Sequence, residues 1–98
     1  MPWNGSGRNN FNQASVTMNA PTHSGVYALF NDGHWIYIGE SLNVRDRLLQ
    51  HLRDSHSDCI KQAAPQYFAW ELTTATYRVQ RQDQLILEMH PTCNQRLG

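Results

Sequence analysis

An Asp-Gly pair between two short apolar runs constrains the fold of this chain most strongly. Residues 25–30 (GVYALF) and 34–39 (HWIYIG) are rich in the β-branched and aromatic residues that strands favour. Asp32 and Gly33 lie between these runs, and a tight hairpin turn needs residues that tolerate positive φ at its centre. The sequence therefore predicts an antiparallel hairpin over residues 25–39.

Each strand of this hairpin carries one tyrosine. Side chains alternate between the two faces of a strand, so Tyr37 is expected to share a face with Trp35, with Ile36 and Ile38 on the other. Tyr27 on the first strand can then meet Tyr37 on one surface of the sheet. Side chains of the helix expected to follow the hairpin would lie beside these two tyrosines.

Length and composition exclude several classes of protein. The chain has 98 residues, of which 40% are hydrophobic, which fits one globular domain and not a disordered chain. Eight basic and eight acidic residues give no net charge, so the chain lacks the overall basic charge of many nucleic-acid-binding proteins. Its basic residues are nevertheless almost all arginine, the side chain best suited to bidentate phosphate contact.

No apolar run reaches the length of a membrane span, and the N-terminus has no signal-peptide core. The chain has only two cysteines, Cys59 and Cys93. We therefore expect no disulfide framework and a reducing, cytoplasmic setting.

The rest of the chain predicts an α+β fold. Residues 1–23 are expected to form a loosely structured lead-in, and residues 24–98 the main domain. Within the domain, apolar spacing predicts a helix near 43–54, a third strand near 67–72 and a second helix near 75–89. The expected architecture is a three-stranded antiparallel sheet flanked by helices, in the order β-β-α-β-α. Three apolar residues could anchor the lead-in to the core: Phe11, Val16 and Met18.

Several short motifs occur in a fixed order along this domain. Gly25-Val26-Tyr27 is followed by Tyr37-Ile38-Gly39, and Arg47 stands eight residues after Gly39, with His51 four residues later. Leu85-Ile86, Pro91 and Asn94 close the series. Together these elements, over residues 24–94, resemble the GIY-YIG nuclease superfamily, which includes homing endonucleases, some restriction enzymes and a bacterial excision-repair nuclease subunit.

The resemblance implies hydrolysis of DNA phosphodiester bonds and gives four residues catalytic roles. Tyr27 or Tyr37 would activate or orient the attacking water, and His51 would relay its proton. Arg47 would clamp the scissile phosphate from the helix face that it shares with His51. Two further positions have a substrate-binding or orienting role by resemblance: Gly39 and Asn94.

One position departs from the family pattern. The resemblance implies a glutamate that holds Mg²⁺ or Mn²⁺ three residues before the Leu-Ile pair, but this chain has Gln82 there. A neutral amide lacks the negative charge that a hard cation prefers. Asp83 points about 100° away around the helix, and Glu88 lies about 9 Å further along its axis, so neither is a good substitute.

Two functions therefore stay open. The chain is either a metal-dependent endonuclease acting on DNA, impaired by Gln82, or a catalytically inactive module of the same kind that binds nucleic acid or a protein partner. A separate motif allows a structural zinc site, because His56 and Cys59, and also His90 and Cys93, are spaced as His-x-x-Cys. Against zinc, histidine before cysteine in both pairs is not a common finger pattern, and the family does not require the metal.

Overall fold

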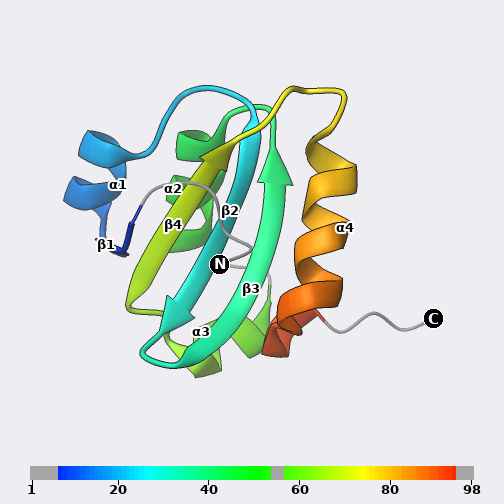
Figure 1. Cartoon of the computed structure of the whole chain (residues 1–98). Helices are drawn as coiled ribbons and strands as arrows, with labels where there is room; N and C mark the ends of the chain where they lie inside the picture. The colour runs from blue at the N-terminus through cyan, green and yellow to red at the C-terminus, as the bar shows by residue number, and fades with distance from the viewer. Residues whose placement is uncertain (1–6, 54–56, 95–98) are drawn as a thin grey trace.

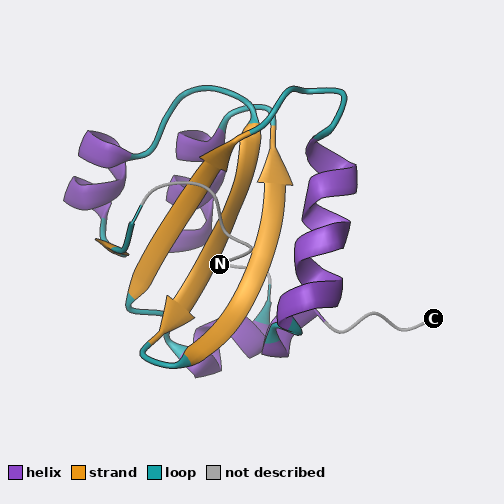
Figure 2. Cartoon of the chain, viewed as in Figure 1, coloured by secondary structure: helices purple, strands orange, loops and turns teal. Residues whose placement is uncertain are grey.

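A four-stranded antiparallel sheet separates two layers of helices in the computed structural model, which describes residues 7–53 and 57–94 (Figures 1 and 2). The strand order in the sheet is β1-β4-β2-β3, so β3 is an edge strand. The elements in chain order are β1 (Asn9–Asn10), α1 (Gln13–Asn19), β2 (Gly25–Asn31), β3 (His34–Ser41), α2 (Val44–Arg53), α3 (Asp58–Ala63), β4 (Tyr67–Leu72), α4 (Arg78–Met89) and the 3-10 helix η1 (Thr92–Asn94).

The α+β class and the predicted hairpin, third strand and two helices are confirmed. Gly33 has a φ of 68°, as the predicted turn requires. The Asn43 side chain accepts a hydrogen bond from the Asp46 amide at 3.1 Å and so caps α2. The sheet has four strands and not three, because Asn9 and Asn10 pair with the outer edge of β4.

A β-bulge changes which face two side chains occupy. The pairing of β2 with β3 shifts between Leu29 and Phe30, so Tyr37 lies opposite Leu29 while Trp35 lies opposite Phe30. Ile36 is the extra residue, and it packs in the same cluster as Tyr37, whereas Trp35 packs on the other face. The expectation that Tyr37 and Trp35 share a face is wrong, because alternation fails at a bulge.

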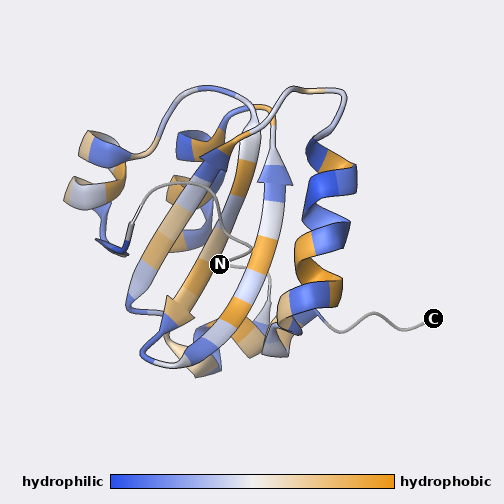
Figure 3. Cartoon of the chain, viewed as in Figure 1, coloured by the Kyte–Doolittle hydropathy of each residue, from blue (hydrophilic) through white to orange (hydrophobic). Residues whose placement is uncertain are grey.

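Each face of the sheet has its own apolar core. The face covered by α1, α2 and α3 is the larger, and α4 covers the other (Figure 1). Figure 3 shows that the N-terminal half of α4 is mostly hydrophilic, whereas most of the hydrophobic residues of the helix lie in its C-terminal half. The buried residues of the larger core are Val16, Ala20, Tyr27, Leu29, Ile36, Val44, Leu48, Ile60 and Phe68, and those under α4 are Val26, Ala28, Ile38, Ala69 and Leu85.

The segment before β2 contributes to the larger core. Asn12 caps α1 by accepting a hydrogen bond from the Ser15 amide at 2.8 Å. Of the three expected anchors, Val16 is buried and Phe11 packs against the core, but Met18 is 81% exposed and anchors nothing.

The chain after α4 returns to the exposed edge of β3. The helix ends at His90, which has a φ of 50°, and Pro91 follows. In η1, the Asn94 side chain accepts a hydrogen bond from the Ile38 amide at 2.7 Å and donates one to the Ile38 carbonyl at 2.8 Å. Asn94 therefore satisfies the Ile38 backbone on the side of β3 where no other strand pairs among residues 7–53 and 57–94.

A disulfide between Cys59 and Cys93 joins α3 to η1. The expectation of no disulfide framework is therefore wrong: residues separated by 34 positions are brought together by the return of the chain along β3. The pairing also removes both thiolates that the zinc alternative needs, and His56 lies outside the described residues. No helix among the described residues is long and apolar enough to cross a membrane.

Candidate active site

Three aromatic side chains from different elements meet beneath α2. Tyr27 comes from β2, Tyr37 from β3 and His51 from α2. The ring centroids of Tyr27 and Tyr37 are 6.2 Å apart, and the His51 ring lies 5.6 Å from the first and 5.5 Å from the second. Side chains separated by up to 24 positions thus form one cluster, at spacings typical of interacting rings.

Tyr27 is fully buried, and its phenol oxygen is 2.8 Å from Nε2 of His51. Burial is the main cause that raises the Tyr27 pKa above its usual value, and the neighbouring Tyr37 raises it further. A hydrogen bond from Arg47 acts in the opposite direction, but burial outweighs it. Tyr27 is therefore a neutral phenol at physiological pH.

Arg47 links this buried phenol to the surface. The neighbouring Tyr27 phenol raises the Arg47 pKa, and the Arg47 guanidinium donates to Oε1 of Gln50 at 3.1 Å, while the residue as a whole is exposed. The phenol of Tyr27 can either donate to Nε2 of His51 or accept from it, depending on the tautomer of the imidazole. The structure thus brings Arg47, Tyr27 and His51 together, with a hydrogen bond between the last two.

Gly39 and Asn94 shape the strand that carries Tyr37. A Cβ at Gly39 would lie 2.4 Å from the phenol oxygen of Tyr27, so a side chain at this position would displace the tyrosine. The Asn94 amide uses both its donor and its acceptor on the Ile38 backbone. In this structure both residues position β3, and their predicted substrate contacts stay a prediction.

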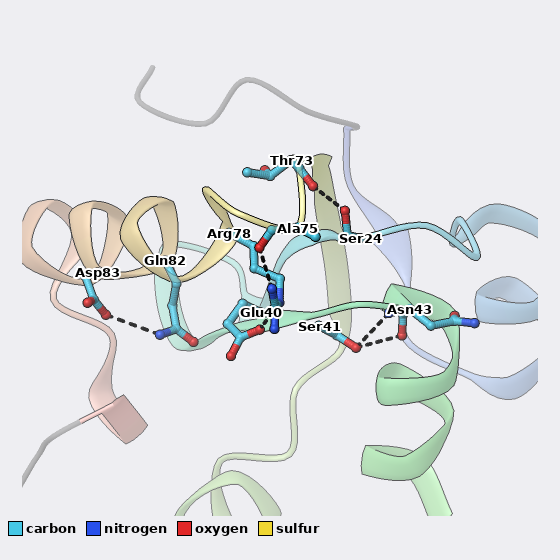
Figure 4. A network of polar contacts seen from close by, with 9 residues as sticks. All are labelled: Ser24, Glu40, Ser41, Asn43, Thr73, Ala75, Arg78, Gln82 and Asp83. Atoms are coloured by element: carbon cyan, nitrogen blue, oxygen red, sulfur yellow. Dashed lines mark hydrogen bonds and ion pairs between the residues drawn. The ribbon is translucent and has the colours of Figure 1, made fainter.

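Gln82 lies in the other layer, on α4, so it is not part of the tyrosine cluster. The helices α2 and α4 flank the edge strand β3 from opposite faces of the sheet (Figure 1). Gln82 is only 9% exposed, and its Nε2 donates to Oδ1 of Asp83 at 3.2 Å (Figure 4). Glu88, the other acid considered above, is exposed.

Sequence reasoning missed a row of charged residues under the first turns of α4. Val26 pairs with Glu40 on one side and with Glu71 on the other, so the two carboxylates flank one residue on the same face of the sheet. Arg78 donates to Glu40 at 2.7 Å, and Arg81 donates to Glu71 at 2.7 and 3.0 Å. The alternation of side chains along a strand was the available signal. Gly39 belongs to the face that carries Tyr27, so Glu40, the next residue, must point to the opposite face.

The described residues could bind a cation only if water and substrate supply most of its ligands. Among residues 7–53 and 57–94, no group of three or more His, Cys, Asp or Glu side chains is arranged to hold a metal ion. Mg²⁺ in phosphate-handling sites is usually bound by one or two carboxylates together with waters and substrate phosphates. A single carboxylate near Gln82 would meet that requirement.

Comparison with protein-family models finds a match to the GIY-YIG catalytic domain over residues 23–92. Among curated proteins, UvrABC system protein C of Hydrogenobaculum sp. (strain Y04AAS1) is 51% identical over 35 residues. That match covers 36% of this chain but only 6% of the longer relative.

Solved structures share the fold. The N-terminal GIY-YIG endonuclease domain of UvrC from Thermotoga maritima, bound to its catalytic divalent cation magnesium, superposes with a TM-score of 0.70 at 21% identity. The superposition covers 82% of this chain and 96% of that domain. A point mutant of the same domain gives a TM-score of 0.71 at 21% identity, covering 83% of this chain and 96% of that one.

Proposed function

The chain belongs to the GIY-YIG family, and from this premise we propose that it is an endonuclease-like phosphodiesterase acting on DNA, weakened by Gln82. The observation that carries the proposal is the convergence of three residues: the buried Tyr27 phenol lies 2.8 Å from Nε2 of His51, and exposed Arg47 is close enough to exchange pKa shifts with that phenol. A phosphate contact and a proton acceptor are thereby fixed relative to each other, as phosphodiester hydrolysis needs.

The burial of each tyrosine divides their roles. Tyr27 is inaccessible to solvent, so we assign it to orienting His51 and Arg47 and not to contact with the attacking water. Tyr37 is half-buried beside the same imidazole, so we assign it to the water. We assign the Tyr27 phenol, 2.8 Å from Nε2, to fixing the orientation and tautomer of the His51 ring.

Arg47 is the residue that we assign to the scissile phosphate. Its guanidinium donates to Gln50 at 3.1 Å and lies near the buried Tyr27 phenol while the residue reaches the surface. A preoriented guanidinium loses less conformational entropy on binding phosphate than a mobile side chain does.

When bound, Mg²⁺ or Mn²⁺ would stabilise the negative charge that develops on the phosphate and leaving-group oxygens. We propose that Gln82 is a weak ligand for such a cation, because its carbonyl oxygen is neutral. Cleavage by the unaltered chain is therefore expected to be weak.

The second candidate is a catalytically inactive module that uses the same surface to bind nucleic acid or a protein partner. Gln82 favours it, since a chain that no longer cleaves does not need a charged ligand at this position. Under either function, we propose that residues 24–98 carry the chemistry and that the segment before them adds to the core.

Cleavage of duplex and single-stranded oligonucleotides in Mg²⁺ and in Mn²⁺ tests the proposal. We expect slow cleavage that rises about 10²-fold or more in Gln82→Glu, because removal of charge stabilisation of this kind costs several kcal/mol. Arg47→Ala should abolish cleavage, and Arg53→Ala, an exposed arginine on the same helix, is the matched control. No cleavage by the unaltered chain or by Gln82→Glu, with binding that depends on Arg47, would favour the inactive module.

We also propose a cytoplasmic setting for a chain that acts on DNA. In that setting the disulfide between Cys59 and Cys93 would be largely reduced. Mass measurement of alkylated thiols in freshly lysed cells tests this expectation.

A further inference from the structure

Glu40 and Arg78 form an ion pair immediately beside Gln82. Arg78 and Gln82 are one helical turn apart, so their side chains share a face of α4. Nε of Arg78 donates to Oε1 of Glu40 at 2.7 Å, and the two side chains are only 23% and 28% exposed (Figure 4). A largely covered carboxylate therefore stands at the face of the helix that carries Gln82.

The Gln82 amide is turned so that its oxygen faces this carboxylate. Its nitrogen donates to Asp83 on one side, and Figure 4 shows its oxygen pointing toward Glu40 on the other. No donor among the described residues hydrogen-bonds this amide oxygen. Two oxygen acceptors that point toward each other without a donor between them form a place that a cation stabilises.

The second glutamate of the same row provides an internal comparison. Glu71 receives two hydrogen bonds from Arg81, and the two side chains are 11% and 17% exposed. Glu40 receives a bond from Arg78 on Oε1 alone, and none of the described residues binds its Oε2. The Glu71 pair is a closed bidentate contact that attaches α4 to the sheet, whereas the Glu40 pair keeps one carboxylate oxygen available.

Glu40 also lies within electrostatic reach of the candidate active site. It follows Gly39 directly, and its negative charge contributes to raising the pKa of both Tyr27 and Arg47. A cation held here would therefore act on the same region as the phosphate-binding arginine.

We propose that Glu40 supplies the carboxylate that position 82 lacks. In this arrangement Oε2 of Glu40 and the amide oxygen of Gln82 bind a divalent cation of the Mg²⁺ or Mn²⁺ class, and Arg78 is the counterion of Glu40 when no cation is bound. Waters and substrate phosphates complete the coordination, as is usual for Mg²⁺. The role that we give the cation rests on the proposed function. Binding of the cation, however, can be measured without nucleic acid.

Binding of Mn²⁺ alone, followed by the loss of the free-ion signal in electron paramagnetic resonance, tests the proposal. We expect weak binding by the unaltered chain and at least a tenfold loss of affinity in Glu40→Gln. Arg78→Gln should bind Mn²⁺ more tightly, because the guanidinium no longer competes, and Gln82→Glu should bind it most tightly. A gain of affinity cannot result from misfolding, so Arg78→Gln keeps the test valid even if Glu40→Gln is unstable.

Glu71→Gln and Arg81→Gln are the matched controls, since they alter the equivalent pair over β4. Neither should change Mn²⁺ affinity, and thermal melts establish that each variant is folded. The proposal is overturned if Glu40→Gln binds as the unaltered chain does, if Arg81→Gln gains as much as Arg78→Gln, or if only Gln82→Glu binds. If binding follows Glu40 but no variant cleaves DNA, the nuclease function fails and the cation site stands.

Discussion

The phenol of Tyr27 lies directly over Gly39, its pairing partner across β2 and β3. The tyrosine of the first motif therefore packs directly against the glycine of the second. Because glycine has no side chain, the phenol can enter the space between β3 and α2 and reach His51 at 2.8 Å. The spacing of the two motifs reflects this packing as well as the chemistry of the tyrosines.

Gly39→Ala should therefore destabilise the fold and disrupt the site. The added Cβ would lie 2.4 Å from the Tyr27 oxygen and 2.9 Å from its Cε2, so the buried ring must move. Overpacking of this kind costs about 1–3 kcal/mol, measurable by urea denaturation. Gly33→Asn is the control, because nothing lies within 4 Å of its Cβ and asparagine tolerates its φ of 68°. Equal, small losses in both variants would show that the Tyr27 ring is not fixed by Gly39.

Tyr27 should resist ionisation for as long as the chain stays folded. Its pKa is raised in the folded state, mainly by burial, while an unfolded tyrosine titrates at about pH 10. Its contribution to stability is therefore fully present below about pH 10 and is lost as the pH rises toward the folded pKa. Titration of phenolate absorbance should show one tyrosine that ionises only on alkaline unfolding.

Tyr27→Phe removes both that late transition and the associated fall in stability at high pH. Tyr77→Phe, which alters an exposed tyrosine, should retain both. Ionisation of Tyr27 in the folded chain at about pH 10 would contradict its burial.

Local patterns predicted the hairpin, β4, α2 and α4, because their signals were short-range, but they did not predict the short elements β1, α1 and α3. The Asp-Gly turn, the apolar spacing of α2 and the proline after α4 each act within a few residues of the structure that they specify. The pairing of Asn9 and Asn10 with β4 had no such signal, because this edge strand has only two residues. Its polar sequence lacks the alternation that identifies a strand.

Within the candidate site, only the residues that belong to the recognised series of motifs could be predicted from the sequence. Tyr27, Tyr37, Arg47 and His51 do come together, although their roles stay predictions. Glu40 was missed because its importance depends on a contact with Arg78, 38 positions away. A β-strand register and a helix orientation must both be known before that contact can be inferred.

Asn94→Ala should loosen the edge of β3 without removing any buried apolar group. The variant loses the acceptor for the Ile38 amide and the donor to its carbonyl. Hydrogen bonds of this kind contribute about 0.5–1.5 kcal/mol each, so we expect a loss of about 1–3 kcal/mol. Hydrogen exchange of the Ile38 amide should accelerate, whereas Thr92→Ala, which alters an exposed contact with His34, should leave it slow. Unchanged Ile38 exchange in Asn94→Ala would mean that water replaces the asparagine without cost.

The disulfide between Cys59 and Cys93 should stabilise the same strand edge from a distance. It closes a loop with a sequence separation of 34 residues, and cross-links of such loops stabilise folded chains by about 2–4 kcal/mol in the chain-entropy account. Because Cys93 precedes Asn94, reduction should also release η1 and accelerate exchange of the Ile38 amide. Dithiothreitol should lower the melting temperature of the unaltered chain, and the Cys59→Ser, Cys93→Ser double variant should melt at the reduced value with no further response to the reagent. An unchanged melting temperature after complete reduction, confirmed by thiol titration, would show that the contacts of Asn94 and Thr92 with β3 hold η1 without the cross-link.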